Sequence, residues 1–361
     1  MKQLKLLAIG LIAALAFTAC SDDDGPFFTI DPVGQMSGAY VINQGNYYGG
    51  VDGTLDHLTL TGDSAYTQRV FVAVNNGQSL GSSPQGAVTY GSRIYVPMYA
   101  ENLVWVIDKT TARIVTSIQT NEPEAVCAAD GYVFVSNNDG YVSRIDTLTL
   151  AIDTHEAVGP NPAQMCTTGG KVYVSISDGY NSGGGYVDGC RVAEIDAQTG
   201  TKVRDIAVGV NPGPIAADAD GRLFVVCRGN YADIASAVWT IPAGATAGSE
   251  LAPASLIAVN GTTLYAINSV TDWSINQTLV DFKTYDTTTG TLTADNFLAG
   301  QPTPPAPQAI NINPQNGDIY ICSDRSSAEY DKPGLLYVYK ADGTHLKTYD
   351  TGIHPVGVVW Y

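Results

Sequence analysis

The sequence predicts an all-β fold, a β-propeller of seven four-stranded antiparallel blades, from three observations. A proline that leads a short apolar run recurs at intervals of 39 to 54 residues, about the length of one blade. A Gly-bearing turn and a β-rich run follow each of the first six prolines. The two ends of the chain carry complementary parts of one more unit. The prolines are Pro84, Pro123, Pro162, Pro212, Pro253, Pro307 and Pro355.

Each predicted unit reads as four strands joined by turns. Turns such as Asp130-Gly131 and Asn260-Gly261 accept the positive φ of tight hairpins, and runs such as YVFVS and KVYVS follow such turns. A third run then ends in Asp, and a fourth strand follows. We interpret these Asp residues as turn formers rather than catalytic pairs, because they recur on the short-loop side. They are Asp108, Asp146, Asp196 and Asp286.

The two ends of the chain predict how the ring closes. Residues 38–43 (GAYVIN) match the second strand of a unit and lack a Pro-led first strand. Residues 353–361 form a first strand with nothing after it. Joined to residues 38–80, they complete a seventh blade, so the C-terminal strand is expected to pair with the N-terminal strands and leave no open sheet edge. The propeller therefore spans residues 38–361.

The N-terminal residues have the pattern of a targeting signal. Residues 1–19 combine a basic start, an apolar run of about 12 residues and small residues before Cys20, the pattern of a cleaved signal peptide. The pattern resembles a bacterial lipobox, which implies lipid attachment at Cys20, and residues 20–37 would form an acidic tether. Residues 21–24 (SDDD) resemble the surface-export signal of Bacteroidetes lipoproteins, which implies an outer-membrane location facing the cell exterior. A plain signal peptide and a simple acidic spacer are the alternatives.

Two segments carry a resemblance to known propellers. Residues 169–175 (GGKVYVS) and 194–203 (EIDAQTGTKV) resemble YVTN-type seven-bladed propellers. Residues 39–55 (AYVINQGNYYGGVDGTL) are similar to lipoprotein propellers of Bacteroidetes. Members of that group sit beside outer-membrane transporters, and some capture cobalamin. The resemblance implies capture of cobalamin or a related corrinoid and its transfer to a TonB-dependent transporter. We expect the protein to be a monomer.

Candidate binding residues gather on one face, where the second-to-third loops and the blade-to-blade connections open. Function usually sits where a rigid scaffold presents variable loops. Tyr and Trp offer flat apolar area with a hydrogen-bonding end, which suits a large neutral ligand such as a corrinoid or a glycan. Arg228 and Arg325 are expected at corresponding loop-entry positions. Packing between loops, and pairing of these arginines with carboxylates, are the alternatives. The candidates are Asn46, Tyr47, Tyr48, Tyr99, Asn137, Tyr180, Tyr186, Arg228, Tyr231, Trp273, Arg325, Tyr330 and His354.

Composition and motifs exclude several functions. With 18 Lys+Arg against 35 Asp+Glu, the chain lacks the clustered cations that nucleic-acid binding needs. No nucleophile, zinc-protease or phosphate-loop motif appears, so we expect no enzyme, no cofactor and no metal. A propeller hydrolase or lactonase and a glycan- or protein-binding propeller remain the alternatives. A Cys190–Cys227 disulfide and a calcium site between Asp178 and Asp188 also stay open.

Overall fold

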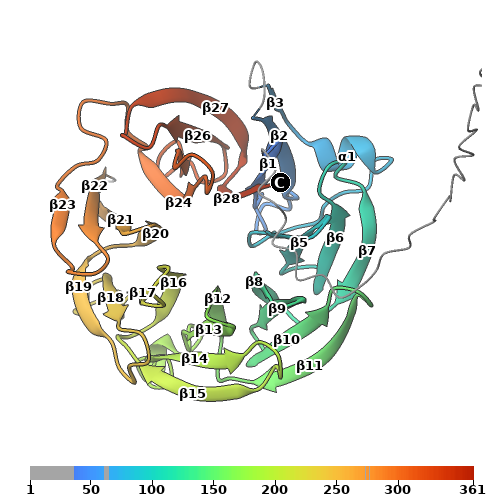
Figure 1. The fold of residues 1–361 in the computed structure, drawn as a ribbon. Helices are drawn as coiled ribbons and strands as arrows, with labels where there is room; N and C mark the ends of the chain where they lie inside the picture. The colour runs from blue at the N-terminus through green and yellow to red at the C-terminus, as the bar shows by residue number, and fades with distance from the viewer. Residues whose placement is uncertain (1–35, 61–64, 273, 276) are drawn as a thin grey trace, which may run out of the picture.

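The computed structural model describes residues 36–60, 65–272, 274–275 and 277–361. Their strands form seven four-stranded antiparallel sheets set around a central axis (Figure 1). The seven-bladed propeller predicted from the sequence is confirmed. The signal peptide, Cys20, most of the tether and Trp273 lie outside the described residues. Among the described residues, no helix has the length and apolar character to cross a membrane.

Each blade runs from an innermost strand at the axis to an outermost strand at the rim. From the innermost to the outermost strand, the first two blades are β28 (Pro355–Trp360), β1 (Gly38–Asn43), β2 (Thr54–Thr59) and β3 (Tyr66–Thr67), and β4 (Val88–Tyr90), β5 (Arg93–Met98), β6 (Leu103–Asp108) and β7 (Ile114–Gln119). The next three blades are β8 (Pro123–Ala129), β9 (Tyr132–Asn137), β10 (Tyr141–Asp146) and β11 (Ala151–Ala157); β12 (Pro162–Thr168), β13 (Lys171–Ile176), β14 (Arg191–Asp196) and β15 (Lys202–Ala207); and β16 (Pro212–Ala217), β17 (Leu223–Cys227), β18 (Ala237–Ile241) and β19 (Ser249–Pro253). The last two blades are β20 (Leu256–Asn260), β21 (Thr263–Asp272), β22 (Gln277–Asp286) and β23 (Leu292–Ala294), and β24 (Ala306–Ile312), β25 (Ile319–Asp324), β26 (Pro333–Tyr339) and β27 (His345–Ile353).

The ring closes where the predicted half-units meet. Strand β28 pairs antiparallel with β1, with Val41 opposite Val358. The pairing continues past the strands, because Tyr361 N donates to Gly38 O at 3.0 Å. The Tyr361 hydroxyl also lies 2.6 Å from Nε2 of His57 on the next strand outward. The C-terminal strand therefore supplies the innermost strand of the first blade, as the sequence predicted.

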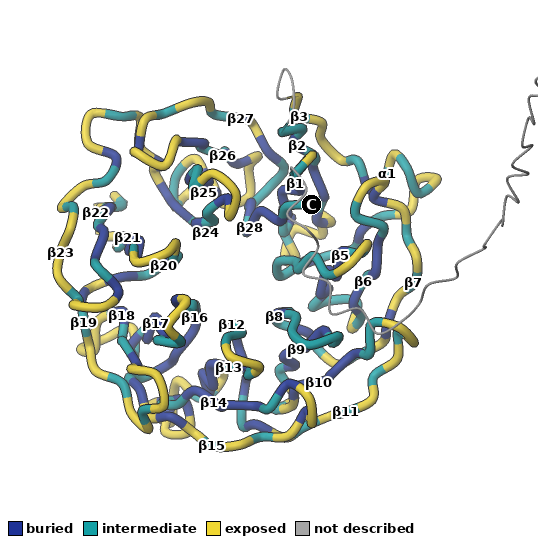
Figure 2. The backbone as a smooth tube through the Cα atoms, in the orientation of Figure 1, coloured by how far each residue is buried: buried dark blue, intermediate teal, exposed yellow. Residues whose placement is uncertain are grey.

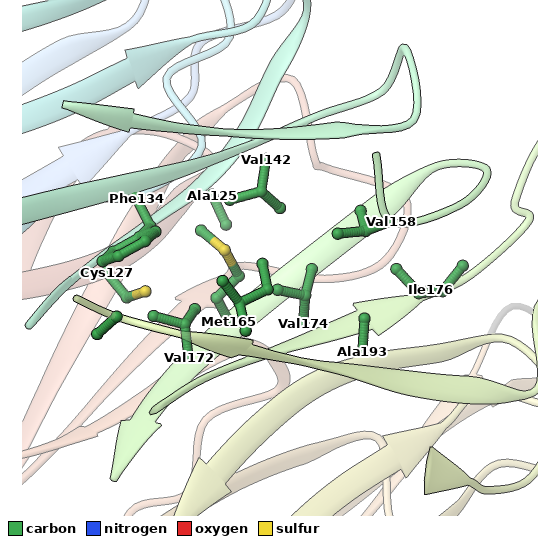
Figure 3. Packing of buried hydrophobic residues seen from close by; sticks show 12 residues of the cluster. Ala125, Cys127, Phe134, Val142, Val158, Met165, Val172, Val174, Ile176 and Ala193 are labelled. Atoms are coloured by element: carbon green, nitrogen blue, oxygen red, sulfur yellow. The ribbon is translucent and has the colours of Figure 1, made fainter. Parts of the chain in front are cut away.

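The core lies between neighbouring blades. Sheets stack face to face, so side chains from one blade interdigitate with those of the next. Figure 3 shows Cys127 and Phe134 of one blade packed against Met165 and Val172 of the following one. The middle strands are buried on both sides, whereas the outermost strands alternate between exposed and partly buried residues (Figure 2). Cys127 is therefore a small core residue.

The Asp residues that end third strands form turns. Oδ1 of Asp108 accepts hydrogen bonds from the backbone N–H groups of Thr110 at 3.0 Å and Thr111 at 2.9 Å. Corresponding backbone hydrogen bonds end on Asp146, Asp196 and Asp286. Each carboxylate thus holds the turn into the fourth strand, which is the local role that Asp plays in Asx-turns.

Two details of the predicted blades are corrected. Pro253 ends the outermost strand β19, opposite Ala237, and does not lead an innermost strand. Ala254, three residues before Ile257, occupies the place of the other prolines, and the N–H of Ser255 after it donates to Ile267 O at 2.8 Å. In addition, a short helix α1 (Val70–Val74) connects the first two blades. Its buried Phe71 contacts Trp105, with the ring centroids 5.9 Å apart.

We predict that Asp196 titrates near pH 2 and that Lys171→Ala raises its pKa toward the ordinary value of about 3.9. The hydrogen bond from the Lys171 ammonium is the main cause of the low pKa. Because the folded pKa lies below the unfolded one, ionised Asp196 adds stability above about pH 4 that is lost as the pH falls through about 2. An NMR titration of the carboxyl carbons checks both values, with Asp146 as an internal control that the substitution leaves unchanged. An unshifted Asp196 pKa in the variant would contradict the assignment.

Candidate functional site

A cavity of about 580 Å³ opens at the mouth of the propeller, on the face that carries the long loops. The β1–β2, β5–β6, β9–β10, β13–β14, β17–β18 and β25–β26 loops all contribute residues to its wall. Blade-to-blade connections supply further residues just before innermost strands. The cavity lies within the size range of small-molecule sites, and elements from most of the ring converge on it.

Nine of the residues that the sequence predicted line this cavity. They come from five second-to-third loops and from one blade-to-blade connection, so residues that are hundreds of positions apart in the sequence line the same cavity. These residues are Asn46, Tyr47, Tyr48, Tyr99, Tyr180, Arg228, Tyr231, Tyr330 and His354.

Three other candidates lie away from the cavity. Asn137 is fully buried inside its blade, where Nδ2 donates to Ser143 Oγ at 2.9 Å. Tyr186 is buried within the β13–β14 loop, where its carbonyl accepts a hydrogen bond from Gly189 N–H at 2.9 Å. The Arg325 guanidinium pairs with Asp350. Trp273 lies outside the described residues.

The displacement of Arg325 has a simple cause in the register. Cys227 pairs with Pro212, and the corresponding residue opposite Pro307 is Ser323. Arg228 therefore corresponds to Asp324, so Arg325 is one position further along. A shift of one residue in an extended chain turns a side chain to the opposite side. The two arginines were predicted to occupy corresponding places, and they do not.

Five tyrosines on this face are exposed rather than packed. The exposed fraction is 97% for Tyr48, 74% for Tyr231 and 68% for Tyr180, while Tyr47 and Tyr330 are also more than half exposed. Side chains this exposed add little to the free energy of folding. Exposed aromatic groups gathered around one cavity are typical of a binding surface.

A hydrogen-bond chain fixes one wall of the cavity. The Tyr180 hydroxyl lies 2.9 Å from the Tyr99 hydroxyl and accepts a hydrogen bond from Asn138 Nδ2 at 3.3 Å. Asn138 Nδ2 also donates to Glu124 Oε2 at 3.3 Å. The chain joins three blades, so it positions Tyr180 although its ring is largely exposed to solvent.

The charged groups in the wall nearly balance. Loss of solvation raises the pKa of Glu124, and the positive charge of Arg228 partly offsets that rise. Arg228 in turn donates from Nη2 to Gln164 Oε1 at 3.4 Å. One cation and one carboxyl group on the same wall leave little net charge for an ionic ligand, which favours a neutral ligand with many polar groups.

Backbone conformation marks several wall residues that the sequence did not predict. The residue before the repeat proline has a positive φ in five blades, a conformation uncommon outside glycine. The φ values are 56° at Ser83, 46° at Asn161, 58° at Asn211 and 52° at His354, and these four residues line the cavity. Sequence reasoning selected His354 alone. Ser83, Asn161 and Asn211 could have been found from the sequence because each directly precedes a repeat proline, as His354 does.

A second repeat position also lines the cavity. It is the residue directly after the second strand of a blade, and its side chain turns toward the mouth. Tyr99 and Arg228 were predicted there, whereas Gln44, Asn138 and Ser177 were not. Aligning this one position across the blades would have found them.

Metal and disulfide chemistry find little support. In residues 36–361, apart from the positions left undescribed, no group of three or more His, Cys, Asp or Glu side chains is arranged to hold a metal ion. Oδ2 of Asp178 instead accepts hydrogen bonds from Asn181 Nδ2 at 2.9 Å and from Asp188 N–H at 3.2 Å. Cys190 and Cys227 are both free thiols.

Comparisons with known proteins agree with the fold and leave the ligand open. A family model described as a domain of unknown function (DUF5074) matches residues 37–356. No curated protein matches. The chain is similar to a quinonprotein alcohol dehydrogenase-like protein from Bacteroides thetaiotaomicron, with 15% identity, a TM-score of 0.62 and coverage of 90% of this chain and 78% of that one. It is also similar to hydrazine synthase from Kuenenia stuttgartiensis, with 15% identity, a TM-score of 0.60 and coverage of 75% and 88%. At such low identity these likenesses show the fold alone.

We predict that Arg228→Gln raises the pKa of Glu124 further above its ordinary value, because the substitution removes the cation that opposes the effect of burial. The protonated form of Glu124 is then favoured over a wider pH range. A carboxyl NMR titration measures the change. Arg325→Gln is the matched control, since Arg325 pairs with Asp350 instead. An unchanged or lower Glu124 pKa in Arg228→Gln would contradict the assigned contact.

Proposed function

The chain belongs to the DUF5074 family, whose function is unknown, and from this premise we propose that it is a ligand-capture propeller. The single observation that carries the proposal is the cavity of about 580 Å³ lined by tyrosines and neutral polar groups. Tyrosine rings provide flat contact area at a low cost in side-chain entropy, and their hydroxyls bind polar edges. The rigid ring of blades holds these loops in place before the ligand arrives, which reduces the entropy lost on binding.

We propose cobalamin or a related corrinoid as the ligand. A corrinoid combines broad ring faces with a rim of neutral carboxamides. The ring faces match the exposed tyrosines, and the carboxamides match amide groups such as those of Asn46 and Gln85. The chain carries a formal charge of −17, which disfavours an anionic ligand, whereas the near-balanced wall suits a neutral one. Residues 39–55 resemble lipoprotein propellers of Bacteroidetes, some of which capture cobalamin, and this supports the same choice.

We also propose a location and a role for this capture. The lipobox-like pattern before Cys20 would anchor the chain in the outer membrane, and the acidic run after it would direct the chain to the cell exterior. The bound corrinoid would then pass to a TonB-dependent transporter. Beyond the lipidated Cys20, residues 21–37 would act as the tether, which at full extension spans at most about 60 Å.

Binding without chemical conversion is part of the proposal. An acyl-transfer site needs a nucleophile hydrogen-bonded to its base. His354 lies in the wall, but within the described part of the chain no hydroxyl or thiol is hydrogen-bonded to its Nε2. A glycan is the second candidate ligand, because exposed tyrosines such as Tyr48 and Tyr231 also stack on sugar rings.

We predict that the full chain binds cyanocobalamin and that the double variant Tyr48→Ala/Tyr231→Ala weakens this binding at least tenfold. The two rings are highly exposed, so their loss removes contact area for the ligand and leaves the fold intact. Isothermal titration calorimetry measures the affinity, and circular dichroism checks the fold.

Leu148→Ala is the control, because Leu148 is an exposed apolar residue in the turn between β10 and β11, on the opposite face. Its affinity should equal that of the unmodified chain. No binding of cyanocobalamin at micromolar protein would contradict the corrinoid proposal, and binding of an oligosaccharide instead would favour the glycan.

A further inference from the structure

A buried carboxylate holds one imidazole at the cavity. The side chain of Asp324 is 1% exposed, and its Oδ2 lies 2.9 Å from Nδ1 of His354. Gln308 Nε2 donates to the same oxygen at 3.0 Å. Because a carboxylate accepts and does not donate, Nδ1 carries the hydrogen. In the neutral imidazole the lone pair then sits on Nε2, the nitrogen that does not face Asp324.

The backbone of His354 is also held in place, which restricts where its imidazole can lie. His354 has a φ of 52°, and Pro355 follows it, a combination that few residues other than glycine adopt. Its carbonyl accepts a hydrogen bond from Gln44 N–H at 2.8 Å. Strained backbone of this kind persists where surrounding contacts enforce it, and it recurs before the repeat proline in four other blades. The ring is therefore oriented before any ligand arrives.

A histidine oriented by a carboxylate suits three kinds of chemistry. As a general base it would need a nucleophile on Nε2, and the described residues place none there. As part of a metal cage it would need two or more further ligands, and no such group is present among the described residues. A metal that is already held by a macrocycle needs only one ligand from the protein, and His354 alone could supply that ligand. Metal-ligating histidines commonly donate their other N–H to a carboxylate, as His354 does to Asp324.

We propose that Nε2 of His354 is an axial ligand to the metal of a macrocyclic complex bound at the mouth of the propeller. This inference rests on the proposed function, in which the complex is a corrinoid. The Nε2 lone pair forms a bond to cobalt, one axial water leaves, and the oxidation state of the metal does not change. A haem would present the same kind of open position, but its two propionates disfavour it beside an acidic chain.

The test uses cobinamide, a corrinoid that lacks a nucleotide base and so brings no axial nitrogen of its own. The full chain, with cobinamide reduced to Co(II), is studied by electron paramagnetic resonance. One axial ¹⁴N ligand splits each cobalt line into three, and ¹⁵N-labelled histidine changes the splitting to two. We expect both patterns in the unmodified chain. Haemin, tested in parallel by absorption spectroscopy, should give no imidazole-bound spectrum.

Variants identify the ligand. His354→Gln should abolish the nitrogen splitting while calorimetry still detects cobinamide binding, weakened about tenfold or more. Asp324→Asn should weaken the coordination, because the amide lacks the negative charge and one of the two oxygens that accept from Nδ1. His345→Ala is the control, since His345 lies on the outermost strand β27 and bonds to Thr348.

The outcomes separate the two proposals. If cobinamide binds to the unmodified chain without nitrogen splitting, the axial ligand is overturned and the capture function stands. If the splitting survives in His354→Gln, the assignment to His354 is overturned. If cobinamide and cyanocobalamin both fail to bind, the inference and the capture function fall together. Imidazole coordination of haemin in place of cobinamide would overturn the choice of a corrinoid.

Discussion

The structure depends on the pairing of the last strand with the first. Strand β28 supplies the innermost strand of a blade whose other three strands come from the opposite end of the chain. A ring of sheets without this closure would expose two sheet edges and the faces of two blades. Closure also fixes His354, because that residue connects β27 to β28 and its carbonyl accepts a hydrogen bond from Gln44 after β1. The constraint that completes the fold thus also builds one wall of the cavity.

Repetition places the binding groups. In most blades the residue before the first strand and the residue after the second strand lie at the same end of the axis. Because these positions recur, the chain needs only to vary the side chains there to build a wall from separate blades. The strands form the ring, whereas the loops carry exposed aromatic side chains such as Tyr48, which do not pack in the core. Fold stability and the proposed ligand recognition therefore rest on different residues.

The sequence predicted the fold well because its signals are local and repeated. Proline-led runs, Gly turns and Asp-ended strands each report a local conformation, and the half-units at the two ends report closure. The site was predicted less completely because it depends on register. The sequence pattern placed Arg325 at the loop-entry position that Arg228 occupies in its own blade, but an offset of one residue turns Arg325 toward Asp350. Tyr186 looked like its neighbours in composition, yet the fold of its loop buries it. Pairings such as Asp324 with His354 join distant residues and leave no local signal.

We propose that the mouth on the long-loop face binds the ligand. Hydrogen exchange of the full chain, with and without saturating cyanocobalamin, checks this binding site. We expect slower exchange in residues 44–48, 176–190 and 228–236, which lie at or beside the cavity. We expect no change in the turns at residues 108–112, 146–150 and 196–200 on the opposite face. Protection confined to those turns, or unchanged exchange across the whole chain, would show that the mouth does not bind the ligand.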